Sequence, residues 1–131
     1  MYARVDAASY LQQANRDTFI AVQAETRLAI ENADAIAAVD GVDCVFVGPF
    51  DLSIDLGFPG QVEHPEEVAC IDRMMAACRS HGRAAGTLLF DAAKLKEWIG
   101  KGMRFVVYSS DVTLLADAAL AAVKDLKSSV I

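Results

Sequence analysis

The sequence predicts an α/β protein built on a parallel β-sheet, and two observations carry this prediction. First, four short runs rich in branched or aromatic residues are almost continuously apolar, which is typical of strands buried on both faces. Second, each run is followed by a helical pattern of apolar residues, which gives the order β-α-β-α-β-α-β-α and right-handed crossovers. The predicted strands are Phe19–Gln23, Cys44–Val47, Ala84–Phe90 and Phe105–Tyr108.

Helix start and stop signals separate these strands. Gly41 ends the first helical pattern, Pro65 suits the first turn of the second, and Asp91 is a favourable N-cap for the third. The predicted helices are Thr26–Val39, His64–Gly82, Asp91 to Gly100 or Gly102, and Asp111–Lys127, with residues 4–16 as a helical lead-in.

Four βα units can be arranged in two ways. One is an open sheet of the flavodoxin type, and the other is half of an eight-unit barrel, which takes about 250 residues. Periodicity does not decide between them. The 131 residues contain no linker and no low-complexity segment, so we expect one domain over residues 1–131.

Composition excludes several classes of protein. A hydrophobic content of 54% is too high for a disordered chain, and a net charge of −6 argues against nucleic acid or an anionic membrane as the partner. No apolar run approaches the roughly 20 residues of a membrane span, and no signal peptide begins the chain, so we expect a cytoplasmic location. The cysteines Cys44, Cys70 and Cys78 are expected to be small core residues in a reducing compartment.

Two carboxylates follow neighbouring predicted strands. Glu25 lies at the end of the first strand run, two residues after Gln23, and Asp51 comes shortly after the second strand. Parallel strands end at the same edge of a sheet, so both side chains would meet there and repel each other unless they shared a proton or a cation. Oxygen ligands without a nearby His or Cys favour Mg²⁺ or Mn²⁺. The alternative is that both residues only cap the helices that follow.

The stretch Gly48-Pro49-Phe50-Asp51 predicts an anion site next to this pair. A Gly-Pro turn after a buried strand permits close approach of the backbone, and the helix start that follows directs N–H groups outward. Such a start can receive a carboxylate or a phosphate. An ordinary turn at the exit of a strand is the alternative.

Specific motifs in this region resemble those of the HpcH/HpaI aldolase family. The paired signature is Gln23-Ala24-Glu25-Thr26 and Gly48-Pro49-Phe50-Asp51-Leu52-Ser53, and the likeness covers nearly the whole chain in order. Further matching segments are Glu31-Asn32, Ile36–Val39, Gly41–Asp43, Leu56-Gly57, His64-Pro65, Gly86–Leu88, Gly102–Val107 and Ser110-Asp111.

The resemblance implies a (β/α)₈ barrel enzyme, a class II aldolase that cleaves 4-hydroxy-2-oxo acids to pyruvate and an aldehyde. It implies that Glu25 and Asp51 bind a divalent metal, Mg²⁺ or Mn²⁺ with Co²⁺ as a further candidate, which the 2-oxo acid chelates. Gln23 would orient substrate or a metal-bound water. The N–H groups of Phe50 and Asp51 would bind the substrate carboxylate, and Leu88 would pack on the pyruvate unit.

The chain departs from the family in its length, because family members carry four more βα units before this segment. The absent half would hold the acid–base histidine and an arginine, so we expect no catalytic acid or base here, and His64 and His81 are expected to be capping or surface residues. A half-barrel exposes sheet edges and an apolar face. We therefore expect a homo-oligomer or a complementary N-terminal half-barrel as partner, with the apolar helix Asp111–Lys127 suited to contact another subunit. The alternatives are a non-catalytic barrel remnant or assembly module, and a lyase resembling the citrate lyase β subunit.

Overall fold

Four parallel strands form the sheet in the computed structural model, which describes residues 6–128. They pair in chain order, β1-β2-β3-β4, with Gln23 opposite Phe46, Phe46 opposite Gly86, and Gly86 opposite Phe105. The strands are β1 (Ala21–Gln23), β2 (Cys44–Val47), β3 (Ala84–Leu89) and β4 (Phe105–Tyr108). The predicted parallel sheet is therefore confirmed, with two strands shorter than expected.

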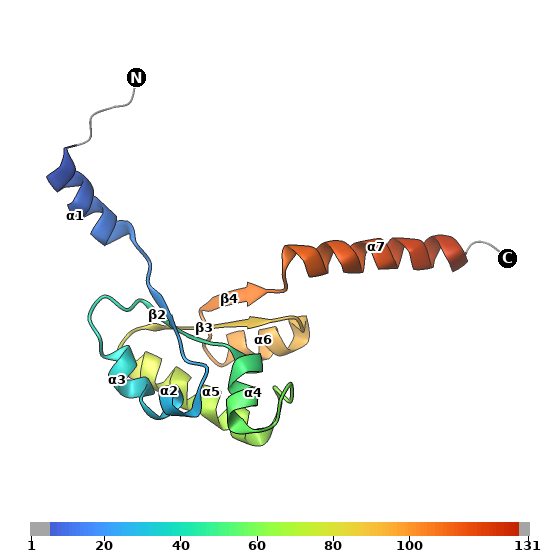
Figure 1. Cartoon of the computed structure of the whole chain (residues 1–131), viewed down its shortest axis with the longest axis horizontal. Helices are drawn as coiled ribbons and strands as arrows, with labels where there is room; N and C mark the ends of the chain where they lie inside the picture. The colour runs from blue at the N-terminus through green and yellow to red at the C-terminus, as the bar shows by residue number, and fades with distance from the viewer. Residues whose placement is uncertain (1–5, 129–131) are drawn as a thin grey trace.

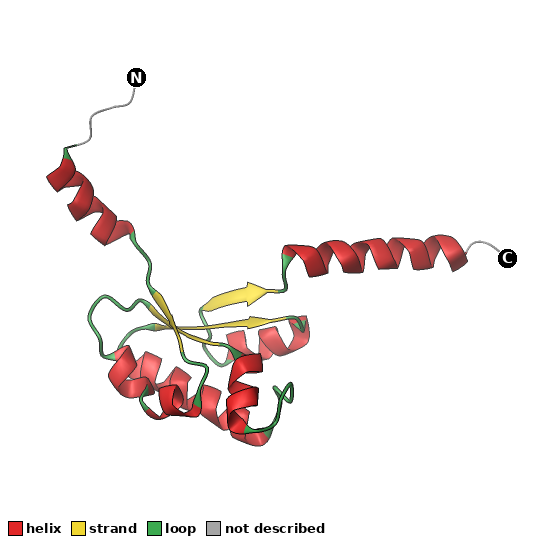
Figure 2. Cartoon of the chain, in the orientation of Figure 1, coloured by secondary structure: helices red, strands yellow, loops and turns green. Residues whose placement is uncertain are grey.

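Five helices cover one face of this sheet and leave the other face open (Figure 1; Figure 2). They are α2 (Arg27–Glu31), α3 (Ala33–Ala37), α4 (Pro49–Leu56), α5 (Pro65–Ser80) and α6 (Ala92–Gly100). An open flavodoxin-type sheet changes strand order at its centre and carries helices on both faces. Sequential strands covered on one face are instead the arrangement of consecutive units in a β/α barrel.

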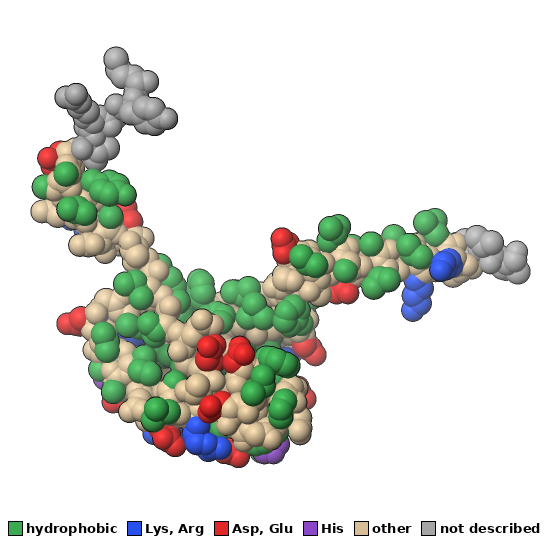
Figure 3. Space-filling view, viewed as in Figure 1, with side chains coloured by type: hydrophobic (Ala, Val, Ile, Leu, Met, Phe, Trp, Pro, Cys, Tyr) green, Lys and Arg blue, Asp and Glu red, His purple; other side chains and the backbone are tan. Residues whose placement is uncertain are grey.

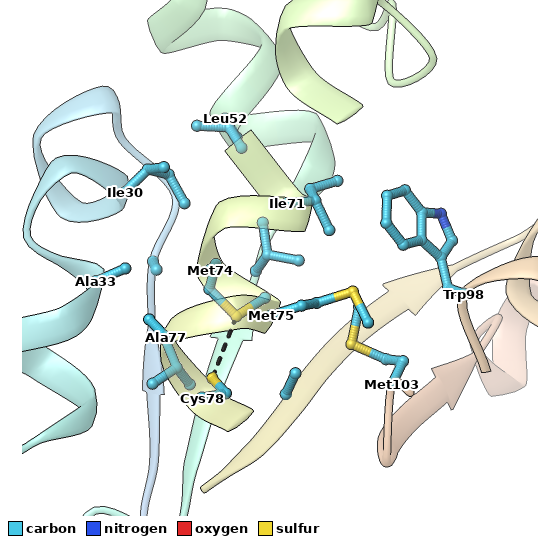
Figure 4. Close-up of a cluster of buried hydrophobic side chains, with 14 of the residues drawn as sticks. Ile30, Ala33, Leu52, Ile71, Met74, Met75, Ala77, Cys78, Trp98 and Met103 are labelled. Atoms are coloured by element: carbon cyan, nitrogen blue, oxygen red, sulfur yellow. Dashed lines mark hydrogen bonds between the residues drawn. The ribbon is translucent and has the colours of Figure 1, made fainter. Parts of the chain in front are cut away.

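The core fills the layer between the sheet and these helices (Figure 4). Val45 and Val47 enter it from β2, and α5 contributes Met74 and Cys78, whose sulfur atoms lie 3.5 Å apart. The predicted role of the cysteines as core residues holds for Cys44 and Cys78, which are buried, whereas Cys70 is half-buried. Burial raises the pKa of the Cys44 thiol to about 11. The thiol therefore stays protonated at neutral pH.

The predicted helix Thr26–Val39 is wrong in continuity, because it divides at Asn32 into α2 and α3. The Asn32 side-chain amide donates to the Leu28 carbonyl at 2.8 Å, and Asn side chains that bond nearby backbone compete with helix geometry. The division also changes which residues are buried. Ile30 and Ala33 enter the core, whereas Leu28 is 67% exposed.

An aromatic cluster lies on the open face of the sheet. Phe105 on β4 contacts Phe19, with ring centroids 5.1 Å apart, and Phe46 on β2, at 6.0 Å. The expectation that all strands are buried on both faces is wrong for β1 and β4, since Phe105 is 39% exposed and no residue of β1 is fully buried. The physical reason is that the described residues place no second layer of strands over this face.

Gly86→Ala should destabilise the fold, because Gly86 lies directly beneath the aromatic cluster. An added Cβ would lie 2.8 Å from both the Phe105 carbonyl oxygen and Phe46 Cδ2, and 2.9 Å from Cys44 Sγ. The carbonyl belongs to the neighbouring strand and cannot move away without disturbing the sheet. We expect a loss of roughly 1–3 kcal/mol in the free energy of unfolding, measured by urea titration.

Gly100→Ala is the matched control for this substitution. A Cβ at Gly100, the last residue of α6, meets no atom within 4 Å, and alanine is favoured over glycine in helices by up to about 1 kcal/mol. This variant should be neutral or slightly stabilised. Equal unfolding midpoints for the two variants would contradict the packing assigned to Gly86.

Helices α1 (Ala7–Asp17) and α7 (Asp111–Ser128) project away from the sheet (Figure 1). Neither buries a single residue among those described, and α7 carries hydrophobic side chains along its length (Figure 3). Its exposed apolar residues are Val112, Leu114, Leu115, Leu120, Val123 and Leu126. None of the helices within residues 6–128 combines the length and the apolar character that crossing a membrane requires.

Candidate metal and substrate site

Glu25 and Asp51 converge beside Gly48 at the carboxyl edge of the sheet. Glu25 follows β1, and Asp51 lies in the first turn of α4, directly after β2. A Cβ placed on Gly48 would lie 2.9 Å from Glu25 Oε2 and 3.5 Å from Asp51 Oδ2. The two carboxylates therefore share one small volume that exists only because residue 48 lacks a side chain.

Gln23 holds one of these carboxylates in place. Its Nε2 donates to Glu25 Oε2 at 3.2 Å, and its backbone is fixed by the pairing of β1 with β2. The next residue, Ala24, extends that pairing, because its N–H donates to the Phe46 carbonyl at 2.7 Å. Glu25 thus leaves the sheet from a fixed backbone and is oriented by a neighbouring amide.

The start of α4 presents two free backbone donors. Gly48 is the N-cap and Pro49 the first helical residue, and no hydrogen bond within residues 6–128 engages the N–H groups of Phe50 or Asp51. Unpaired N–H groups in the first turn and the helix dipole together favour an anion. The helix starts at Pro49, directly after the glycine, so Asp51 lies within its first turn.

Ser53 fixes the loop that borders this helix start. Its hydroxyl donates to the Phe50 carbonyl at 2.6 Å and accepts from the Gly60 N–H at 2.8 Å, and the residue is completely buried. The ring of Phe58, in the same loop, stacks on His64 with centroids 3.7 Å apart. This role of Ser53 could not be predicted from the sequence, because it depends on a tertiary contact between the helix and a loop with no periodic signal.

Both histidines have the structural roles expected of them. His64 caps α5 by accepting from the Glu66 N–H at 3.3 Å, and His81 ends the same helix with its Nε2 3.0 Å from Asp34 Oδ1. The described chain therefore offers no free imidazole beside Glu25 and Asp51.

A pocket of about 420 Å³ opens next to the carboxylates. All the predicted site residues except Glu25 line it: Gln23, Gly48, Pro49, Phe50, Asp51 and Leu88. Four further residues complete the lining, namely Val62, Leu89, Phe90 and Asp91. Phe50 and Phe90 are 60% and 58% exposed. Val62 could not be predicted as a lining residue, because it comes from the loop that Ser53 holds.

The donor set at this edge fits a hard divalent cation. Mg²⁺ typically takes one or two carboxylates and completes its shell with water and substrate oxygens. Glu25 and Asp51 provide such a pair. Within residues 6–128, no group of three or more His, Cys, Asp or Glu side chains is placed to hold a metal ion.

One further carboxylate, Glu67, is buried outside this pocket. It lies in the first turn of α5, is 0% exposed, and neither of its oxygens has a hydrogen-bond partner within the described chain. Burial raises the pKa of the Glu67 carboxyl to about 7. A buried acid could not be predicted here, because a glutamate in a first helical turn is ordinarily solvated.

Comparison with known proteins matches residues 3–118 to the family described as HpcH/HpaI aldolase/citrate lyase. The chain belongs to this family. Two HpcH/HpaI aldolase/citrate lyase family structures share its fold at a TM-score of 0.87. One, from Desulfitobacterium hafniense DCB-2, is 37% identical and covers 96% of this chain. The other, from Burkholderia cenocepacia J2315, is 35% identical and covers 91%.

Curated HpcH/HpaI relatives are named 4-hydroxy-2-oxo-heptane-1,7-dioate aldolase. The protein from Salmonella heidelberg (strain SL476) is 44% identical over 111 residues, and that from Escherichia coli (strain ATCC 8739) is 44% identical over 110 residues. The matches cover 85% and 84% of this chain but 42% of each relative. The chain likewise spans 49% and 46% of the two solved structures. Its fold is therefore half of the family's barrel.

Proposed function

We propose that this chain supplies the metal-binding half of a class II aldolase site, which cleaves 4-hydroxy-2-oxo acids to pyruvate and an aldehyde. The observation that carries the proposal is the convergence of Glu25 and Asp51 beside Gly48, at one edge of an HpcH/HpaI half-barrel. The name of the curated relatives supports the reaction class.

Glu25 and Asp51 would hold Mg²⁺ or Mn²⁺, with Co²⁺ as a further candidate. A divalent metal supplies a Lewis acid that polarises carbonyl oxygens. Side-chain and backbone groups of this chain would position the carboxylate ligand and the substrate. Gln23 keeps the Glu25 carboxylate oriented, and the free N–H groups of Phe50 and Asp51 donate to the substrate carboxylate at the start of α4.

The apolar side of the pocket would pack against the reacting carbons of the substrate. Leu88 lies at the end of β3, and Phe50, Val62 and Phe90 continue this apolar wall outward.

In the cleavage, the bond between carbons 3 and 4 of the substrate breaks, the 4-hydroxyl loses its proton, and carbon 3 gains a proton to become the methyl group of pyruvate. Both described histidines have structural roles, so the proton-transfer group is expected from a complementing half.

The exposed apolar surfaces support the need for a partner. The cluster of Phe19, Phe46 and Phe105 on the open sheet face, and the exposed leucines of α7, together exceed the scattered hydrophobic residues of an ordinary monomer. A complementary N-terminal half-barrel or a second copy of this chain would cover the sheet face and pair its edge strands.

Complementation tests this function. The chain is mixed with the part of the Escherichia coli relative that it does not match, and pyruvate release from a 4-hydroxy-2-oxo acid is followed with Mn²⁺ present. Activity should appear only on mixing and should be lost when the chain carries Glu25→Gln. A verified complex of the two halves that releases no pyruvate would refute the proposal.

A further inference from the structure

A second pocket lies at the opposite end of the sheet, and three arginines surround it. Arg79 comes from the last turn of α5, Arg83 precedes β3, and Arg104 precedes β4. The pocket holds about 260 Å³ and has Met75, Cys78 and Ala85 among its apolar lining. We infer that this pocket, the arginine pocket, binds a small organic anion carrying phosphate or carboxylate groups.

Two of the three guanidinium groups are free to bind a ligand. No hydrogen bond or ion pair within residues 6–128 engages the side chain of Arg79 or of Arg104. Arg83 is fixed instead, because its Nε and Nη2 donate to the carbonyls of Ala37 and Val39, both at 3.1 Å. One anchored and two unpaired guanidinium groups thus face the same pocket.

The residues that line this pocket carry a net positive charge, which favours binding of an anion. Its lining contains no carboxylate, although the whole chain has 18 acidic residues against 12 basic ones. The nearest recorded acid is Asp40, whose exposed carboxylate lies 3.8 Å from Arg83 Nη2. Three like charges around one cavity repel each other, and a bound anion would replace this repulsion with charge-assisted hydrogen bonds.

The helix dipole does not explain why three arginines line this pocket. A basic residue in the last turn of a helix gains from the helix dipole, which accounts for Arg79 alone. Arg104 lies in no helix, directly after Gly102 and Met103. Guanidinium groups bind planar carboxylates and phosphates through paired N–H donors, and the apolar lining suits a carbon skeleton more than a bare inorganic ion.

The arginine pocket is independent of the metal site. It borders the amino ends of β3 and β4, whereas Leu88 and Asp91 border the carboxyl end of β3. Six residues of strand separate these ends by about 20 Å. Anion binding can therefore be measured without metal, and its failure would leave the proposed aldolase site untouched.

Isothermal titration of the full chain with malonate, and separately with inorganic phosphate, tests the inference at constant ionic strength without metal. We expect saturable binding of one anion per chain, tighter for malonate. Arg79→Gln and Arg104→Gln should each weaken it by about tenfold, and Arg104→Lys by less, because lysine keeps the charge but not the paired donors. Thermal unfolding confirms that each variant is folded.

Lys96→Gln is the matched control, since Lys96 is an exposed cation outside the arginine pocket with no recorded partner. It should bind both anions like the unaltered chain. If Arg79→Gln, Arg104→Gln and Lys96→Gln weakened anion binding equally, the binding would depend only on the overall charge of the chain, and the inference would be overturned. Absence of binding for both anions would also overturn it, as would binding of an aspartate-rich peptide alone, which would make the surface a protein-docking site.

Discussion

Gly48→Ala should abolish most divalent-metal binding while leaving the chain folded. The added methyl would lie 2.9 Å from Glu25 Oε2, at the far end of a flexible side chain, so the Glu25 carboxylate would move aside rather than the backbone. The backbone at Gly48 has a φ of −96°, which alanine adopts without strain. Displacing one of two carboxylates should weaken Mn²⁺ binding by about tenfold to a hundredfold, measured by isothermal titration.

The stability of the same variant separates this effect from misfolding. Replacing a glycine N-cap by alanine costs about 1 kcal/mol, so the urea midpoint should fall only slightly. Gly100→Ala, far from the carboxylates and open to solvent, should keep normal Mn²⁺ affinity. Unchanged affinity in Gly48→Ala would show that the metal does not lie beside Gly48.

Glu67 should make the chain less stable as the pH rises from about 4.5 to about 7. Its folded pKa is raised by burial from 4.5 to about 7, so the folded state favours the protonated form. The stability contribution is complete below the unfolded pKa and is lost as the pH rises through the folded pKa. This difference between the folded and unfolded pKa of Glu67 corresponds to roughly 3 kcal/mol in the free energy of unfolding. Urea titration at a series of pH values measures it.

Glu67→Gln removes the titrating group and should flatten this dependence, with a clear gain in stability at pH 8. Glu63→Gln, on an exposed side chain, should keep the slope of the unaltered chain. Asp6 and Glu97 do not interfere, because hydrogen bonds from Ser9 and Lys94 lower the pKa values of their carboxyls. Their contribution to stability is lost only at more acidic pH. A slope that persists in Glu67→Gln would contradict this account.

Much of the fold could be predicted from the sequence because its local signals agree with one another. Continuous apolar runs gave all four strands, and capping residues such as Asp91, which accepts from the N–H groups of Ala93 and Lys94, placed the helices between them. The break at Asn32 was missed because apolar spacing on both sides continues a single helical pattern. Only the side-chain bond to Leu28 favours a break, and it depends on a rotamer.

The candidate site was predictable where it depends on strand ends. Glu25 and Asp51 follow adjacent parallel strands, and this alone brings them to one edge. The need for glycine at position 48 was foreseen only as close approach of the backbone. The structure identifies the neighbouring group as the Glu25 carboxylate. Ser53, Val62 and the buried acid Glu67 could not be predicted, because each acquires its role from contacts between segments distant in the sequence.

Titration of the full chain with Mn²⁺, followed by the electron paramagnetic resonance signal of the free ion, measures whether Glu25 and Asp51 bind a metal. We expect a single saturable site per chain that is weakened at least about tenfold by Glu25→Gln and by Asp51→Asn. Asp117→Asn, on exposed α7, should have no effect. Saturable Mn²⁺ binding that survives in both site variants, or no saturable binding to the unaltered chain, would contradict the assignment of Glu25 and Asp51 as metal ligands.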